Sequence, residues 1–152
     1  MIAEALLCQY RVVVRDYDCD LFQEFMTAPD KVLGKRILLA DDQQEVREMT
    51  RMMLDMDEYI VTEAANGREA LDLFAPDRFD LVITDYVMPE MKGDELARSI
   101  KRLAPSEPIL MITGSAQELG ARQMFVDAVL NKPFAFEDLR QAVAQLLSPM
   151  PG

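Results

Sequence analysis

Hydrophobic and polar positions follow two different rhythms along most of the chain. Short, continuous apolar runs are followed by longer segments in which apolar residues recur every three or four positions. A short apolar run bounded by turn residues is typical of a strand buried on both faces, and the longer spacing is typical of a helix with one apolar face. From residue 36 to residue 147 the pattern repeats five times, so we expect five strands that alternate with five helices.

The order of these elements predicts a fold class. The expected strands cover residues 37–40, 59–64, 80–84, 109–113 and 127–132. The expected helices cover residues 43–56, 69–74, 94–103, 116–125 and 136–147. Strands that alternate with helices through short connections indicate a parallel sheet with helices on both faces. We therefore expect an α/β domain of the flavodoxin-like, doubly wound class, with strand order 2-1-3-4-5.

Most of the expected helices have apolar stripes that we expect to face the core. The stripe of the first helix consists of Val46, Met49, Met53 and Met56, and that of the third consists of Leu96, Ile100 and Leu103. A stripe of methionines at helical spacing more often fills a core than lines a groove for a partner. The prediction is that both stripes pack on the sheet.

Polar side chains stand at or just beyond the carboxyl ends of four expected strands. They are Asp41 and Asp42, Asp85, Thr113 and Lys132. The carboxyl ends of parallel strands meet at one edge, where open α/β sheets bind ligands, and the expected order places the first and third strands side by side. Three carboxylates in one cleft repel one another and favour a cation, and oxygen ligands favour Mg²⁺.

This set of residue types suits phosphoryl transfer. A carboxylate such as Asp85 can act as a nucleophile toward phosphorus, while a metal ion and the Lys132 ammonium neutralise charge. The Thr113 hydroxyl can bind a phosphoryl oxygen. Taken singly, an Asp after a strand is often a turn or cap residue, and a Lys before a proline is often merely exposed. The order and spacing of all these residues together favour the functional interpretation.

Composition narrows the possible partners and location. The chain has 152 residues, half of them apolar, and a formal net charge of -11, which suits a globular domain and argues against direct binding to nucleic acid. Cys8 and Cys19 do not have a metal-ligand spacing, and the chain has no histidine, so we expect reduced thiols in a cytoplasmic protein. No apolar run approaches the ~20 residues that cross a bilayer, so we expect no membrane association.

Residues 36–147 resemble the receiver domain of bacterial two-component response regulators. The matching features are the pair Asp41–Asp42, the segment DYVMPEMKG from Asp85, the strand ILMITG with Thr113, and LNKPF with Lys132. The resemblance covers about three quarters of the chain. It implies that Asp85 accepts a phosphoryl group from a sensor histidine kinase or a histidine phosphotransfer protein.

The resemblance also implies how the other residues act. Asp42 and Asp85 would bind Mg²⁺ together with the backbone carbonyl of Val87, and Asp41 would act mainly through bound water. The Lys132 ammonium would pair with the phosphoryl oxygens. The chain would not be an enzyme in the usual sense, although it would assist its own phosphorylation and dephosphorylation.

Two further features of the resemblance concern the switch. Thr113 would move onto the phosphoryl group, and the peptide bond between Lys132 and Pro133 would be cis. Members of the family usually carry an aromatic residue or a histidine three positions before the lysine, where this chain has Val129. Val129 therefore supports an alternative, a phosphorylation-independent adaptor with the receiver fold, whereas the intact acidic site opposes it. An aspartyl-phosphate phosphatase would need a second Asp at Val87, so we set that class aside.

The expected organisation has three parts. Residues 1–35 form an N-terminal extension, which could be an ordered arm, a loosely attached segment, or residues upstream of a true start at Met26; we favour the loosely attached segment. Residues 36–147 form the domain, and residues 148–152 a mobile tail. We expect a stand-alone receiver that signals through contact with a downstream protein target. A homodimer that depends on phosphorylation is a further possibility of this family.

Overall fold

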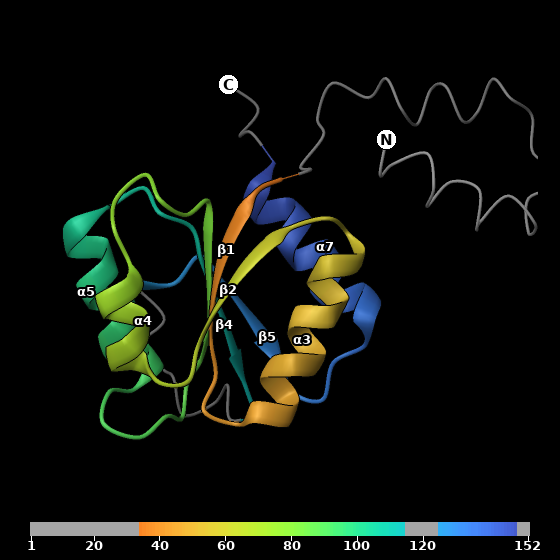
Figure 1. The fold of residues 1–152 in the computed structure, drawn as a ribbon, viewed down its shortest axis with the longest axis horizontal. Coiled ribbons are helices and arrows are strands. Elements are labelled where there is room, and N and C mark those ends of the chain that lie inside the picture. The colour runs from red at the N-terminus through yellow and green to blue at the C-terminus, as the bar shows by residue number, and fades with distance from the viewer. Residues whose placement is uncertain (1–33, 115–124, 149–152) are drawn as a thin grey trace, which may run out of the picture. The chain divides into compact units, whose positions relative to one another are not determined.

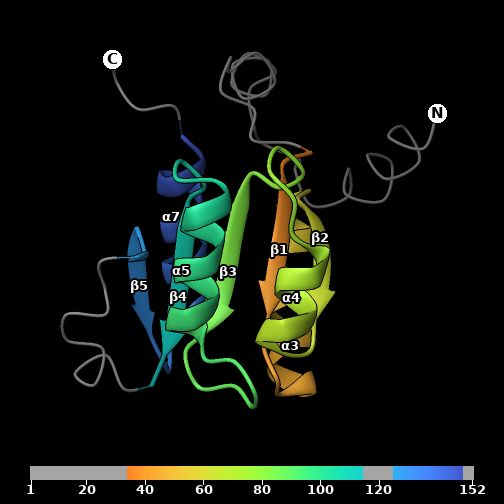
Figure 2. The same cartoon turned by 90° about the vertical axis from the view of Figure 1, so that its left-hand side faces the viewer.

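The computed structural model describes residues 34–114 and 125–148. These residues form a five-stranded parallel sheet in the order β2-β1-β3-β4-β5, in which all strands run in the same direction (Figure 2). The strands are β1 (Arg36–Ala40), β2 (Ile60–Ala64), β3 (Leu81–Asp85), β4 (Ile109–Thr113) and β5 (Ala128–Asn131). The predicted fold class and strand order are confirmed.

Helices cover both faces of the sheet. They are α3 (Gln44–Met56), α4 (Gly67–Leu73), α5 (Gly93–Leu103) and α7 (Phe136–Leu147). Figure 1 shows α4 and α5 on one face, and α3 and α7 on the other. The helix expected over residues 116–125 lies almost entirely outside the described residues. The expected extension over residues 1–35 and the tail over 148–152 fall mainly outside them as well.

Successive side chains of each strand point to opposite faces, and this alternation builds two apolar layers. Leu38 and Ala40 of β1 belong to the layer that packs on α4 and α5. Ile37 and Leu39 belong to the layer that packs on α3 and α7. All five residues of β3, and all five of β4, are buried. A strand that is covered on both faces needs apolar residues throughout, which explains the continuous runs in the sequence.

The orientation of α3 corrects one prediction. Met49 and Met56 were expected to face the core, but they are 52% and 71% exposed. The residues of α3 that are buried are Thr50 and Leu54. Thr50 can occupy the core face because its hydroxyl donates a hydrogen bond to the carbonyl of Val46, at 2.8 Å. Val46 and Met53 of the predicted stripe are half-buried, and Met53 packs against the core layer. The prediction is thus correct at Met53 and wrong at Met49 and Met56, and the core face is rotated toward Thr50 and Leu54.

The prediction that the apolar stripe of α5 faces the core is correct at two of its three positions. Leu96 and Ile100 are fully buried, but Leu103, the last residue of the helix, is exposed.

The start of α4 also differs from the prediction, because Asn66 caps the helix before Gly67. The Asn66 side chain accepts a hydrogen bond from the backbone N–H of Glu69, at 2.7 Å. Such a cap satisfies a backbone donor that the first turn leaves unpaired.

Candidate functional site

Three carboxylates meet at the carboxyl edge of the sheet. Asp41 directly follows β1, Asp42 comes next, and Asp85 is the last residue of β3, the strand that pairs with β1. One ligand atom from each of them lies within 4.8 Å of the others. Asp41 and Asp85 are buried, whereas Asp42 is exposed to solvent. The pairing of β1 with β3 brings these residues together, as the predicted strand order required.

Backbone N–H groups orient the two buried carboxylates. The Oδ1 atom of Asp41 accepts a hydrogen bond from the N–H of Gln43, at 2.9 Å. The Oδ1 atom of Asp85 accepts one from the N–H of Tyr86, at 2.8 Å. Each hydrogen bond holds one oxygen of the carboxylate. The other oxygen of each, Oδ2, is directed toward Lys132.

Lys132 carries the positive charge of this site. Its Nζ atom lies 3.3 Å from Oδ2 of Asp85 and 3.8 Å from Oδ2 of Asp41. Lys132 is placed by the end of β5, where its N–H donates a hydrogen bond to the carbonyl of Thr113, at 2.8 Å. The peptide bond between Lys132 and Pro133 is cis, as the resemblance to receiver domains implied.

Thr113 occupies the position on β4 that corresponds to that of Asp85 on β3, at the carboxyl end of the strand. It is the last residue of that strand and is almost fully buried. In the sheet, Asp85 is paired with Ile112, so Thr113 follows directly after the residue beside Asp85. The four strands β1, β3, β4 and β5 thus each deliver a polar residue to one edge.

Burial and charge determine the protonation of the carboxylates. Burial raises the pKa of Asp85, and the charge of Asp42 adds to this effect, while Lys132 and the Tyr86 N–H act against it. Burial also raises the pKa of Asp41, as do the charges of Asp85 and Asp42. Within the described residues, the Lys132 ammonium pairs with Asp85 and Asp41, two of the three carboxylates. The site therefore has an excess of negative charge and offers the oxygen donors that Mg²⁺ prefers, so its residues fit this ion.

The loop after β3 is packed tightly against the site. A Cβ atom on Gly93 would lie 2.2 Å from the carbonyl oxygen of Asp85, so only glycine fits there. The N–H of Gly93 donates a hydrogen bond to the carbonyl of Tyr86, at 2.9 Å, which closes the loop. Val87, within this loop, has an exposed side chain. A role for its backbone carbonyl in binding a metal ion stays a prediction.

Val129, three positions before Lys132, lies on β5 near the site. It is half-buried in β5 and packs against the buried pair Tyr86 and Met111. Tyr86 directly follows Asp85 in the sequence. An aromatic ring therefore lies near this part of β5, although it is supplied by the residue after β3.

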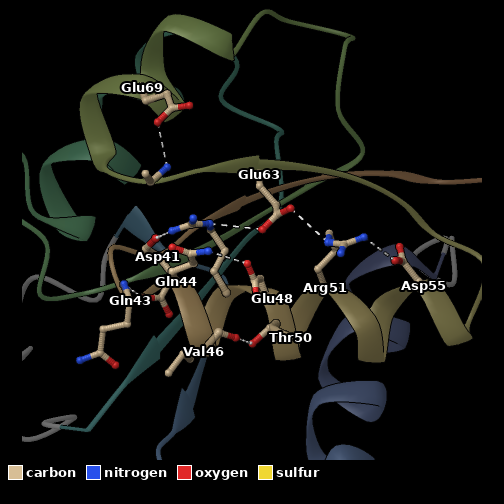
Figure 3. Close-up of polar contacts among 12 residues, drawn as sticks. Asp41, Gln43, Gln44, Val46, Glu48, Thr50, Arg51, Asp55, Glu63 and Glu69 are labelled. Atoms are coloured by element: carbon tan, nitrogen blue, oxygen red, sulfur yellow. Dashed lines mark hydrogen bonds and ion pairs between the residues drawn. The ribbon is translucent and has the colours of Figure 1, made fainter.

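One residue that contacts the site did not emerge from the sequence. The Nη1 atom of Arg47, on α3, donates a hydrogen bond to the backbone carbonyl of Asp41, at 2.7 Å. Its Nε atom donates one to Oε1 of Glu63, at 3.2 Å. Figure 3 shows how Asp41 and Glu63 lie above the helix in this network. A charged residue on a helix is usually interpreted as part of the solvated face, so the only signal was its position one turn into the helix that follows the acidic pair.

Within residues 34–114 and 125–148, no helix combines the length and the apolar character that a membrane crossing requires.

Comparison with known proteins identifies the family. Residues 37–144 match the family model described as the response regulator receiver domain. The chain is 39% identical over 115 residues to the response regulator MprA of Mycolicibacterium vanbaalenii, an alignment that covers 74% of this chain and 50% of that protein. It is 36% identical over 115 residues to MprA of Mycobacterium avium, with the same two coverages. The chain thus spans about half the length of the curated relatives that it matches.

Solved structures of similar chains agree with this assignment. The response regulator TrrA from Thermotoga maritima, solved in complex with Mg²⁺ and BeF, is 33% identical with a TM-score of 0.71, over 74% of this chain and 99% of TrrA. The chemotaxis response regulator CheY4 of Vibrio cholerae is also 33% identical, with a TM-score of 0.67, over 75% of this chain and 99% of CheY4. The chain belongs to the response regulator receiver domain family of two-component signalling.

Proposed function

We propose that this protein is a phospho-accepting response regulator in which Asp85 receives a phosphoryl group. The observation that carries the proposal is the buried Asp85 carboxylate, with the Lys132 ammonium at 3.3 Å and two further carboxylates within reach of one cation. The donor would be the phosphohistidine of a sensor kinase or of a phosphotransfer protein. The solved structure of the similar TrrA contains Mg²⁺ and BeF, which supports a phosphoryl site of this kind.

In this proposal the acidic residues hold the metal ion. Asp42 and Asp85 would bind Mg²⁺ with the backbone carbonyl of Val87, and Asp41 would contribute through bound water. When bound, Mg²⁺ supplies positive charge that neutralises the carboxylates and the phosphoryl oxygens. The positions of the residues support Asp85 as the acceptor, because its Oδ2 atom is nearer to Nζ of Lys132, at 3.3 Å, than that of Asp41, at 3.8 Å.

The transfer step makes one bond and breaks another. An oxygen of the Asp85 carboxylate attacks phosphorus while the bond from phosphorus to the donor histidine nitrogen breaks, and the electron pair returns to the imidazole ring. Lys132 then pairs with an oxygen of the transferred group instead of with the Asp85 carboxylate. Thr113 presents its hydroxyl to another phosphoryl oxygen, and this movement would change the surface near β4.

The consequence of phosphorylation is a change in protein contacts. We infer that the phosphorylated surface near β4 and β5 binds a downstream protein target or a second copy of this chain, without direct contact to nucleic acid. The protein would act in the cytoplasm.

A second candidate function is a phosphorylation-independent adaptor. Val129, where relatives usually have an aromatic side chain or a histidine, favours this alternative. The two candidates differ in one measurable property, because only the phospho-acceptor needs a reactive Asp85.

The test uses acetyl phosphate as a small phosphoryl donor. The purified full chain is incubated with it, with and without Mg²⁺, and the intact mass is measured. We expect one phosphoryl group on the wild type that requires Mg²⁺, and none on Asp85→Asn. Asp72→Asn is the matched control, because Asp72 is an exposed carboxylate on α4 that pairs with Arg68. This variant should be phosphorylated like the wild type.

The opposite results would have a clear meaning. An unmodified wild type with an intact circular dichroism spectrum would reject the phospho-acceptor and leave the adaptor as the leading candidate. Equal modification of Asp85→Asn would show that another residue accepts the phosphoryl group.

A further inference from the structure

Arg47 connects the acidic site to the helix that follows it. Its side chain is only 15% exposed, and its guanidinium group makes two contacts in different directions. Nη1 donates to the backbone carbonyl of Asp41 at 2.7 Å, and Nε donates to Oε1 of Glu63 on β2 at 3.2 Å. Because the guanidinium is planar and always charged, two such contacts fix its orientation.

The Asp41 peptide is consequently held from several sides. Its N–H donates a hydrogen bond to the carbonyl of Ala64, at 3.2 Å, and its carbonyl accepts one from Arg47. Its side chain accepts the N–H of Gln43. The next residue is Asp42, the exposed member of the carboxylate group, whose peptide bond begins at the carbonyl that Arg47 holds. The position of Asp42 therefore depends on this contact.

Arg47 acts on the backbone of the site more than on its charge. The contact that Arg47 makes is with the peptide oxygen of Asp41 and not with its carboxylate. Its contribution is thus to geometry.

We propose that Arg47 is a positioning residue for the magnesium site, because its guanidinium fixes the Asp41 peptide between β2 and α3. The inference rests on the proposed function, in which Asp41, Asp42 and Asp85 bind Mg²⁺. Groups that hold metal ligands in place commonly change metal affinity by about 10- to 100-fold when they are removed. The same order of effect is expected here.

Arg51 provides a matched control on the same helix. Its Nε atom lies 3.1 Å from Oε2 of Glu63, the other oxygen of the carboxylate that Arg47 contacts. Its Nη1 atom donates a hydrogen bond to Asp55, at 3.0 Å, as Figure 3 shows. Arg51 therefore shares one partner with Arg47, but it points toward Asp55 and not toward the acidic pair. Loss of Arg51 removes the ion pairs with Glu63 and Asp55 but leaves the contact between Arg47 and the Asp41 carbonyl in place.

The experiment compares Mg²⁺ binding by isothermal titration calorimetry in wild type, Arg47→Met and Arg51→Met. We expect the Kd of Arg47→Met to rise by about tenfold or more. The Kd of Arg51→Met should stay within about twofold, because an exposed ion pair contributes little. Without Mg²⁺, amide hydrogen exchange at Asp42 and Gln43 should be faster in Arg47→Met only. Thermal unfolding of each variant separates a local change from a general loss of stability.

The outcomes distinguish this inference from the proposed function. If the wild type does not bind Mg²⁺, the proposed function is wrong. If the wild type and Arg47→Met bind Mg²⁺ equally well, the positioning role is wrong and the proposed function stands. If Arg47→Met does not fold, Arg47→Lys replaces it in the Mg²⁺ titration. The lysine ammonium cannot contact both partners in the geometry of the guanidinium fork. Wild-type affinity in Arg47→Lys would likewise overturn the positioning role.

Discussion

Individual buried carboxylates in this protein differ in how well their surroundings compensate for the loss of water. Asp85 receives the Tyr86 N–H and faces Lys132. Glu107 lies at the opposite end of β4, is 7% exposed, and has an Oε1 atom that finds no hydrogen-bond donor within the described part of the chain. Burial, together with the charges of Asp80 and Asp77, raises the pKa of Glu107 to about 7, while Lys101 and Arg36 act against this. Uncompensated burial makes the charged form unfavourable.

This environment predicts that stability depends on pH through Glu107. In the unfolded chain its pKa is near the ordinary value of 4.5, so between pH 4.5 and about 7 the folded chain binds the proton more tightly. The free energy of unfolding should therefore fall as pH rises through this range. We expect roughly 1–2 kcal/mol, since one unit of pKa difference corresponds to about 1.4 kcal/mol and solvent screens part of the effect.

The measurement is urea unfolding of wild type and Glu107→Gln at several pH values between 5 and about 8. Glu107→Gln cannot titrate, so its free energy of unfolding should decline less over this range. Glu95→Gln, at an exposed position of α5, is the control and should follow the wild type. Identical pH dependence in wild type and Glu107→Gln would contradict the prediction.

At the scale of an element, the rotation of α3 can be tested by two apolar substitutions. Leu54 is 2% exposed and belongs to the core layer beneath α3 and α7, whereas Met56, two residues later, is 71% exposed. Leu54→Ala should lower the free energy of unfolding by about 2–5 kcal/mol, because it leaves a cavity. Met56→Ala should change it by about 0.5 kcal/mol or less.

Chemical denaturation of both variants provides the measurement, with the slope against denaturant checked for a common unfolded state. The reverse order, with the larger loss in Met56→Ala, would favour the methionine stripe as the core face of this helix. Similar losses of the free energy of unfolding in both variants would mean that α3 packs on the sheet in another orientation than the one described above.

The difference between correct and incorrect predictions for these elements has a physical origin. β3 and β4 are covered on both faces, so almost every residue in them must be apolar, and the sequence shows them directly. A helix buries only one stripe, and in α3 the polar Thr50 can occupy that stripe because its hydroxyl finds a backbone acceptor. Hydrophobicity alone therefore selected a stripe that is correct at Met53 but wrong at Met49 and Met56.

The same reasoning applies to the candidate site. Asp41, Asp85, Thr113 and Lys132 could be placed because each stands at the end of a strand, and the strand order then determines which ends are neighbours. Arg47 could not be placed in this way. Its role depends on the direction of a long side chain that reaches from a helix back to a peptide carbonyl, and a sequence does not determine that direction.

At the scale of the whole molecule, the site exists only in the folded chain. Asp42 and Asp85 are far apart in the sequence, and the pairing of β1 with β3 brings their ligand atoms to within 4.8 Å. Gathering three carboxylates opposes folding, because like charges repel at short range. A cation that binds this group compensates for that repulsion, and an unfolded chain offers no comparable set of ligands.

Mg²⁺ should therefore raise the free energy of unfolding of the whole domain. A ligand that binds only the folded state stabilises it by about 2.7 kcal/mol when its free concentration is about 100 times its Kd. The measurement is thermal unfolding with increasing MgCl₂, against NaCl at matched ionic strength, which reproduces the screening of surface charge. Asp42→Asn is the informative variant, because Asp42 is exposed and its substitution leaves the core intact while removing a proposed ligand. The free energy of unfolding of this variant should rise little with MgCl₂ beyond the rise given by NaCl.

An equal rise in the free energy of unfolding of wild type and Asp42→Asn would mean that Mg²⁺ binds elsewhere. No rise in either would mean that the folded chain gathers its carboxylates without binding the ion.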